Sequence, residues 1–272
     1  MQVNIDNFEE GYAGVYDISI AQREAGSKAT SREEIDRIGE HPEARSIFAS
    51  GLDQEGFEYL IERYGKQFEA ISFWKNNLVS DLAPLGDLRE LKYLNYFFNQ
   101  RATDLWDMSR NVNLRGLAIY DFTRLHSIER IGTAPCLEYF ALGNRVWSKM
   151  EIDSLKPLIH SSVSHFAWWG NKVLDNDFDC LAQSNIKELD LNIGRFTLDQ
   201  LARINASIPG LTGRVTTPYS EGGVMDQNGR QSWYFLCKGK RRLEKGRDEA
   251  KLEKYLAEFH ALIEKYRVEL SQ

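Results

Sequence analysis

Apolar residues recur along this chain at an interval far longer than one turn of a helix. A segment of the form apolar-x-x-apolar-x-apolar is repeated at intervals of 23, 23, 23, 26 and 23 residues. Its six copies begin at Phe68, Leu91, Leu114, Leu137, Val163 and Ile186. A period of this length predicts one supersecondary unit stacked on copies of itself, in which each segment forms a strand.

A second apolar set, with three-residue spacing, follows most of these segments. Its members are Leu82, Leu85 and Leu88; Leu125, Ile128 and Ile131; Ile152, Leu155 and Leu158; and Leu198, Leu201 and Ile204. This spacing predicts 3-10 turns or helices that return across the outer side of the coil. Residues 81–87 and 129–135 favour 3-10 turns, whereas 197–206 favour a helix. The 26-residue interval predicts extra residues within 145–162, as a bulge or a longer helix on the rim or convex side.

Asparagine occupies the ninth position of three segments, at Asn76, Asn99 and Asn171. With this residue the chain resembles the leucine-rich repeat family, of a bacterial-like, cytoplasmic type, whose consensus is L-x-x-L-x-L-x-x-N. The resemblance covers residues 68–211 and implies an α/β fold, a curved solenoid with a parallel sheet on the concave face and short helices or 3-10 turns on the convex face. In that family the asparagine bonds backbone groups where the chain leaves the strand. Other groups must do so in the repeats that carry Phe122, Arg145 and Gly194 there.

The regions on either side of the repeats are predicted to be caps, because a solenoid exposes apolar surface at both ends. Residues 1–67 form the N-terminal cap, with an edge strand within 11–22, a helix that begins at Thr30 or Ser31 and a degenerate repeat within 44–65. Residues 68–211 hold the six repeats. Residues 212–272 form the C-terminal cap, a hairpin that turns at Asn228-Gly229, followed by a long amphipathic helix.

Composition narrows the class of protein. The net charge of -6 over 272 residues argues against general nucleic-acid binding. The basic run 237–247 is expected to be a solvated turn, with contact to an acidic partner as the alternative. The N-terminus has neither a basic start nor an apolar run, so we expect a cytoplasmic protein without a membrane segment. Three cysteines without a C-x-x-C pair argue against a disulfide framework or a zinc site: Cys136, Cys180 and Cys237.

Alternation along the predicted strands identifies the side chains of the concave face. Small residues form its middle column and aromatic residues flank them, which predicts a shallow trough with solvent-accessible rings. The candidate partner-binding residues are Trp74, Tyr93, Asn95, Phe97, Tyr120, Tyr139, His165, Trp169, Glu188 and Asp190. The alternative is that the rings shield one another, or that the N-terminal cap covers them, so that they are structural.

The function predicted on this basis is non-enzymatic protein-protein interaction, as in an adaptor, inhibitor or immunity-type protein. We expect a monomer that binds a protein partner on the trough, with no cofactor, metal, nucleic acid or membrane. The alternative is a glycan or small ligand on the same face. An enzyme is disfavoured, because His165 and Glu188 could meet as an acid-base pair but no nucleophile accompanies them, and Ala167 lies where one is needed. Replacing Trp74, Tyr120 and Trp169 by alanine is expected to abolish partner capture with little change in thermal midpoint.

Overall fold

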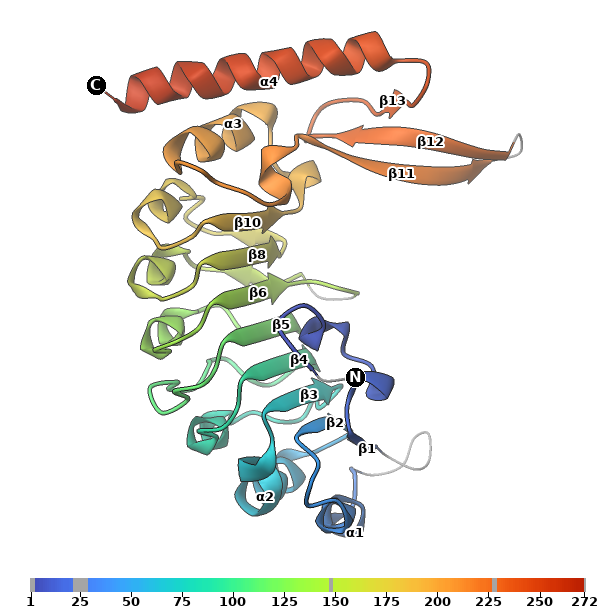
Figure 1. Cartoon of the computed structure of the whole chain (residues 1–272), viewed down its shortest axis with the longest axis vertical. Coiled ribbons are helices and arrows are strands. Elements are labelled where there is room, and N and C mark those ends of the chain that lie inside the picture. Colours follow the sequence, from blue (N-terminus) through green and yellow to red (C-terminus); the bar gives the residue numbers. More distant parts are fainter. Residues whose placement is uncertain (1–2, 22–28, 147–148, 227–228, 272) are drawn as a thin grey trace. The chain divides into compact units, whose positions relative to one another are not determined.

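The computed structural model describes residues 3–21, 29–146, 149–226 and 229–271. The chain forms two compact units, Met1–Asn185 and Ile186–Gln272. The first unit is built on a parallel sheet whose strands follow one another in chain order (Figure 1). These strands are β1 (Ile18–Ile20), β2 (Ser46–Ser50), β3 (Ala70–Trp74), β4 (Tyr93–Asn99), β5 (Gly116–Phe122), β6 (Tyr139–Gly143) and β8 (His165–Trp169).

The register of the sheet is the one that the repeat predicts. Leu94 pairs with Leu117, and Leu117 with Phe140, so equivalent repeat positions lie side by side from strand to strand. The apolar positions of the segments in this unit face the interior and are almost completely buried. Burial of each large apolar side chain contributes about 1.5–3 kcal/mol, which makes this spine the main source of the unit's stability.

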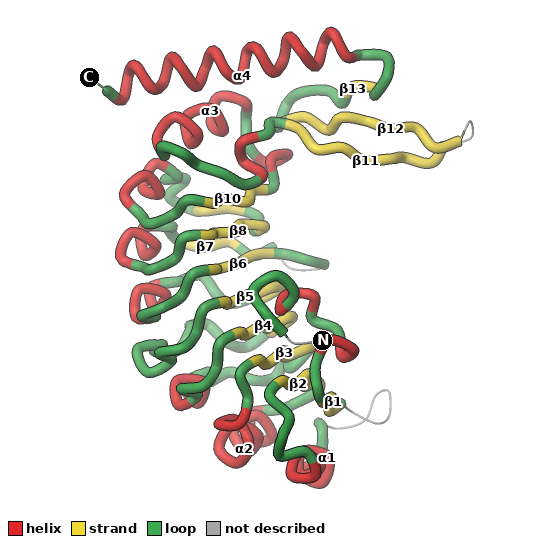
Figure 2. The backbone as a smooth tube through the Cα atoms, viewed as in Figure 1, coloured by secondary structure: helices red, strands yellow, loops and turns green. Residues whose placement is uncertain are grey.

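The segments that connect successive strands lie on the convex side of the sheet, as Figure 2 shows. Four of them contain the five-residue 3-10 turns Ala83–Asp87, Glu129–Thr133, Lys156–His160 and Asp179–Gln183, which confirms the expectation for residues 81–87 and 129–135. Two are helices, α1 (Arg32–Asp36) and α2 (Gln54–Tyr64). Helix α1 begins after Ser31, whose hydroxyl accepts a hydrogen bond from the Glu34 amide over 3.3 Å.

The N-terminal part of the first unit also follows the sequence-based expectation. Strand β2 continues the register of β3, with Ser46 opposite Ala70, and therefore forms the degenerate repeat. Strand β1 pairs with β2 and is the first strand in the order of the sheet, so it is the predicted edge strand.

Two of the three asparagines make the backbone hydrogen bonds that the family resemblance implies. Asn99 is fully buried; its amide donates to the carbonyls of Asn76 and Val79, and its oxygen accepts from two backbone amides of the following turn. Asn76 is also fully buried and bonds the backbone of the preceding repeat. Asn171 differs, because its amide donates to the Glu151 carboxylate over 2.8 Å.

The repeat that carries Phe122 in place of the asparagine uses the preceding residue instead. Asp121 is fully buried at the end of β5, with a left-handed φ of 56°. Its carboxylate accepts from the amides of Arg145 and Val146 at 3.1 and 2.9 Å. An aspartate therefore bonds the turn of the next repeat where Phe122 holds the consensus position.

Among the described residues of the 26-residue interval, the extra residues form no longer helix. They lie between β6 and the 3-10 turn Lys156–His160, which has the same length as its counterparts. This stretch contains β7 (Glu151–Ile152), which pairs in parallel with β9 (Lys172–Val173) in a separate small sheet. The longer-helix option was wrong, because the 3-10 turn of this repeat has the ordinary length and the described residues before it include only the short strand β7, whose partner β9 lies in a repeat of 23 residues.

The second unit contains the last repeat strand and the predicted tail elements. They are β10 (Glu188–Leu191), α3 (Leu198–Ser207), β11 (Tyr219–Asp226), β12 (Gly229–Leu236), β13 (Leu243–Glu244) and α4 (Glu249–Leu270). Helix α3 begins with a capping box between Thr197 and Gln200. Strands β11 and β12 form the antiparallel hairpin, although Asn228 of its predicted turn lies outside the described residues.

Helix α4 has the predicted amphipathic pattern. Its buried residues are Leu252, Tyr255, Phe259, Ile263 and Tyr266. The helix packs on α3, and its Tyr266 hydroxyl donates to the carboxylate of Asp199 there. Its role as a cap for the repeats stays a prediction. No helix in the described ranges is sufficiently long and apolar to cross a membrane.

Candidate functional site

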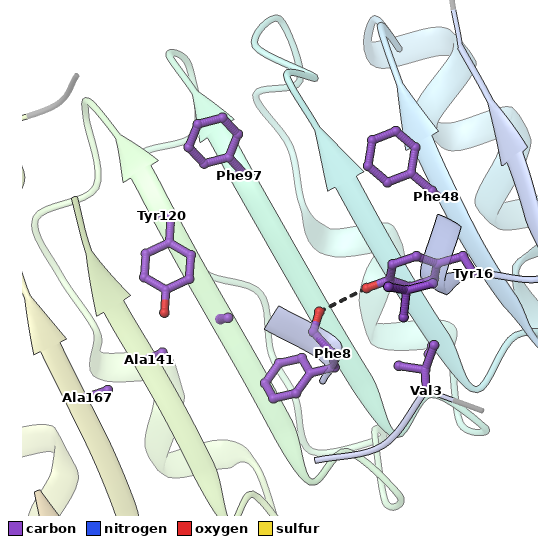
Figure 3. Packing of buried hydrophobic residues seen from close by; sticks show 11 residues of the cluster. Val3, Phe8, Tyr16, Phe48, Phe97, Tyr120, Ala141 and Ala167 are labelled. Atoms are coloured by element: carbon purple, nitrogen blue, oxygen red, sulfur yellow. Dashed lines mark hydrogen bonds between the residues drawn. The ribbon is translucent and has the colours of Figure 1, made fainter. Parts of the chain in front are cut away.

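The concave face of the first unit is covered by the chain's own N-terminus. Residues 3–16, which we call the N-terminal segment, lie over the sheet with two short 3-10 turns, Phe8–Glu10 and Ala13–Val15 (Figure 3). The segment's buried apolar side chains pack with those of the concave face in one cluster. Its contributions to that cluster are Val3, Phe8, Val15 and Tyr16.

Phe8 is the central apolar contact of the segment. Its ring is 1% exposed, stacks on Tyr93 and meets Tyr139 edge-on, with both centroid distances 5.6 Å. Gly116 forms the floor of this socket, because a Cβ atom at that position would lie only 2.9 Å from the Phe8 ring. The missing side chain on β5, between two tyrosines on the neighbouring strands, is thus what admits the phenyl ring.

Glu9 supplies the polar contact next to this socket. The Tyr120 hydroxyl donates to Glu9 Oε2 over 2.6 Å, and the Arg145 guanidinium donates to the same oxygen at 3.1 Å and to the Glu9 carbonyl at 2.8 Å. The guanidinium also lies 4.2 Å from the centre of the Tyr120 ring. Burial, together with the Glu9 charge, raises the pKa of Tyr120 well above its ordinary value, so the phenol stays a donor.

Tyr16 holds the other end of the segment. Its hydroxyl donates to the Phe8 carbonyl over 2.9 Å, and its ring packs 6.3 Å from that of Phe48. Burial raises the pKa of Tyr16 to about 12. The next residue, Asp17, accepts from the backbone amides of Arg45 and Ser46 at 2.9 Å each. Although burial would raise the pKa of Asp17, these hydrogen bonds outweigh it and lower the pKa.

Two buried hydrogen-bond acceptors stay without a donor from the described residues where the N-terminal segment lies on the concave face. No hydrogen-bond donor from the described residues reaches Oδ1 of Asn95 or Oε1 of Glu9. The Asn95 amide nitrogen is 3.4 Å from the Ser72 hydroxyl. Above it the segment passes with Gly11, whose φ of 61° and closeness to Asn95 both exclude a larger residue.

The predicted exposure of the concave rings was therefore wrong in its central part. Phe97 and Tyr120 are 1% exposed and Asn95 is 0% exposed, although all three point to the predicted face. The alternative, in which the N-terminal cap covers this face, is the arrangement that the structure has. The outer candidates are half-buried: Trp74, Tyr93, Tyr139, His165 and Trp169.

The remaining candidates divide between the two units. Within the first, Trp74 lies 4.2 Å from Phe97, and His165 meets Tyr139 edge-on at 4.3 Å between ring centroids. Glu188 and Asp190 lie on β10 of the second unit, where Asp190 accepts from the Arg214 amide over 2.7 Å. That carboxylate therefore bonds a turn of its own unit.

The residues that hold the N-terminal segment on the concave face were not identified from the sequence. Phe8 and Glu9 lie outside the repeat register, and Arg145 was noted only as a replacement for asparagine. The available signal was the presence of apolar residues among polar and acidic ones in the first sixteen positions, but nothing local identifies their partners. Those partners lie on β4, β5 and β6 and in the loop after β6, at least 85 residues along the chain from Phe8.

Comparisons with known proteins agree with the fold. An internalin (InlF) from Listeria monocytogenes has a similar structure, with a TM-score of 0.50 and 15% sequence identity. The similarity covers 77% of this chain and 56% of the internalin chain, so this chain spans little more than half of that protein's length. No protein-family model and no curated protein matches the sequence. At this identity the similarity shows the fold alone: a leucine-rich repeat fold with a parallel sheet, as the repeat predicted.

Proposed function

We propose that this chain is a non-enzymatic protein-binding module that takes its partner on the concave face of the first unit. Leucine-rich repeat folds use such surfaces for protein-protein interaction in general. The observation that carries the proposal is that this face already holds an extended polypeptide, the N-terminal segment, through ring contacts and a bound carboxylate. The same surface is therefore chemically suited to a segment of another protein.

The half-buried rings at the margin of the cover extend this surface. Trp74, Tyr93, Tyr139 and Trp169 are packed against the buried cluster while part of each side chain stays exposed. Aromatic residues with this combination of apolar surface and rigidity dominate the binding energy of many interfaces. We propose that a partner contacts these rings first.

The glycan alternative is less well supported. It relied on Asn95, Glu188 and Asp190 to bond sugar hydroxyls, but Asn95 is fully buried and Asp190 bonds a backbone amide. We further propose that the protein acts in the cytoplasm as a monomer. The three cysteines are free, which is usual in a reducing compartment.

The test begins with affinity capture from the native source, using the full chain. A captured protein is identified, purified and titrated against the unmodified chain and against the Trp169→Ala and Tyr139→Ala variants. We expect each to weaken binding about tenfold or more, because loss of an interfacial ring costs more than about 1.4 kcal/mol.

The matched control is Val112→Ala, which changes an apolar side chain that is 51% exposed in the loop before β5. Its affinity for the partner should stay within about twofold of the unmodified chain. The proposal is wrong if the concave variants bind as the unmodified chain does, or if only the control loses affinity.

A further inference from the structure

The contacts of Phe8 and Glu9 define two adjacent subsites on the concave face. The first is the socket of Tyr93, Tyr139 and Gly116, in which any aromatic ring can take the stacked and edge-on contacts that Phe8 makes. A side chain at position 116 would clash with the ring, so the socket can hold an aromatic ring because residue 116 is glycine.

The second subsite binds a carboxylate. Tyr120 and Arg145 both donate to one oxygen of Glu9, and the arginine also bonds the main chain of the same residue. Charge-assisted hydrogen bonds from a phenol and a guanidinium select an acidic side chain over a neutral or basic one. The bond to the Glu9 carbonyl fixes the main chain of the acidic residue, and the two subsites are filled by the consecutive residues Phe8 and Glu9, so the arrangement favours an acidic residue directly after an aromatic one.

The N-terminal segment occupies these subsites without satisfying all of their polar atoms. Oδ1 of Asn95 and Oε1 of Glu9 are buried, and no donor among the described residues reaches them. Each such acceptor costs about 1–3 kcal/mol relative to a paired one. A competing segment that brings a donor to Asn95 would bind this face better than the chain's own residues do.

The segment can leave without unpairing the sheet. Asp17 bonds the amides of Arg45 and Ser46 on its own, and β1 pairs with β2 beyond it. The bonds that tie residues 3–16 to the strands and their loops include those of Glu9 to Tyr120 and Arg145 and a side-chain bond between Tyr16 and Ser72. Release would expose Phe97, Tyr120 and the alanines of the middle column together, a patch that in solution requires a replacement occupant.

From these contacts we infer that the concave face recognises an extended segment of a partner protein in which an aromatic residue is followed directly by an acidic one. The chain's residues 3–16 occupy the face as an internal ligand that this partner segment displaces. The inference rests on the proposed function and specifies the partner chemistry at the same site.

The experiment uses a labelled synthetic peptide with the sequence of residues 3–16 and the full chain carrying Phe8→Ala and Glu9→Ala. Fluorescence anisotropy should show saturable binding of the peptide to this variant, about tenfold or more tighter than to the unmodified chain, whose face is occupied. Adding Arg145→Ala to the acceptor should weaken binding about tenfold or more, because the carboxylate loses its guanidinium.

Matched peptides test the two subsites separately. Peptides with Phe8→Ala or Glu9→Gln should each bind about tenfold more weakly or worse, whereas Glu10→Gln, which changes an exposed carboxylate, should bind as the original. If the double variant fails to show a cooperative unfolding transition, the full chain with Glu9→Gln alone is the acceptor, since its own Phe8 remains.

The inference is overturned if no folded acceptor binds the peptide, or if binding is indifferent to Phe8 and Glu9. That result is distinct from failure of the proposed function. A purified partner that loses affinity for Trp169→Ala while the peptide never binds would keep the concave face as a binding surface and remove the aromatic-acidic specificity.

Discussion

The hydroxyl of Tyr120 donates a 2.6 Å hydrogen bond to the carboxylate of Glu9, 111 residues away in the sequence. This contact joins the N-terminal segment to the centre of the repeat sheet. It lies next to the Phe8 ring, so one apolar and one charged contact fix the segment together. A surface that the repeat alone would leave open is thereby filled from within the chain.

The Glu9 contact should be measurable in the free energy of unfolding. We expect Glu9→Ala to lower it by about 1.5–3 kcal/mol, because Tyr120 and Arg145 lose a charged acceptor in a partly buried site. The control is Glu10→Ala, which removes an exposed carboxylate and should have little effect. Equal denaturant midpoints for the two variants would contradict the importance of this contact.

Tyr120 is expected to behave as a core residue, contrary to the prediction from the sequence. Tyr120→Ala should lower the free energy of unfolding by about 3–5 kcal/mol, because the ring is 1% exposed and its removal leaves a cavity. The alanine variant of Trp74, Tyr120 and Trp169 should therefore lose much of its thermal stability. Tyr12→Ala, at a tyrosine that is 56% exposed, is the comparison and should leave the midpoint nearly unchanged. A triple variant as stable as the unmodified chain would restore the original prediction.

The buried asparagines give a prediction for the turns. Asn99→Ala should cost at least about 3 kcal/mol in unfolding free energy, because several backbone groups lose their partner at once. Asn113→Ala is the matched control, since that side chain makes one hydrogen bond, to the Arg89 carbonyl, at a more exposed site. Its cost should stay below about 1 kcal/mol. Chemical denaturation of both variants tests this prediction. Similar losses of unfolding free energy would contradict the role of Asn99 in the turn.

Because of Tyr16, we expect the free energy of unfolding to decrease at alkaline pH. Burial raises its pKa from 10.0 to about 12 in the folded chain, so the unfolded chain releases the proton first as pH rises. The contribution of the neutral phenol to the free energy of unfolding is therefore fully present below about pH 10. Between about pH 10 and 12 the free energy of unfolding falls by about 2–3 kcal/mol.

The measurement compares Tyr16→Phe with the unmodified chain at pH 9 and pH 11.5, by denaturant unfolding. The variant should be less stable at pH 9 by about 1 kcal/mol, since it lacks the bond to the Phe8 carbonyl, and should lose less stability on going to pH 11.5. Other titrating groups act alike in both chains. Parallel losses in the two proteins would show that Tyr16 titrates normally.

The repeat spine and its register could be predicted from the sequence because they depend on local alternation and a fixed period. Leu94, Leu117 and Phe140 face the interior and pair in the predicted order. The orientation of the concave residues followed from the same rule. Even the degenerate repeat at β2 kept enough of the pattern to be found.

The burial of the concave face could not be predicted in the same way. Phe8 shows no periodicity that identifies Tyr93, Tyr139 and Gly116 as its neighbours, since these contacts depend on tertiary packing between distant parts of the chain. The role of Asp121 was hidden for a similar reason, because it bonds amides of the next repeat from a position that the consensus does not specify.

The central claim is that the N-terminal segment is a displaceable occupant of the concave face. It is tested most directly by Ala118→Cys in a Cys136→Ser background, because Ala118 is fully buried under the segment and Cys136 is the exposed native thiol. We measure the rate at which a thiol reagent labels the introduced sulfur, with and without Phe8→Ala and Glu9→Ala.

Labelling should be slow with the native segment, about tenfold or more faster with the two substitutions, and slow again when the peptide of residues 3–16 is added. Fast labelling with the native segment would show that the face is not covered. Slow labelling that the two substitutions leave unchanged would show that the face is a permanent part of the core, and either result would contradict the account.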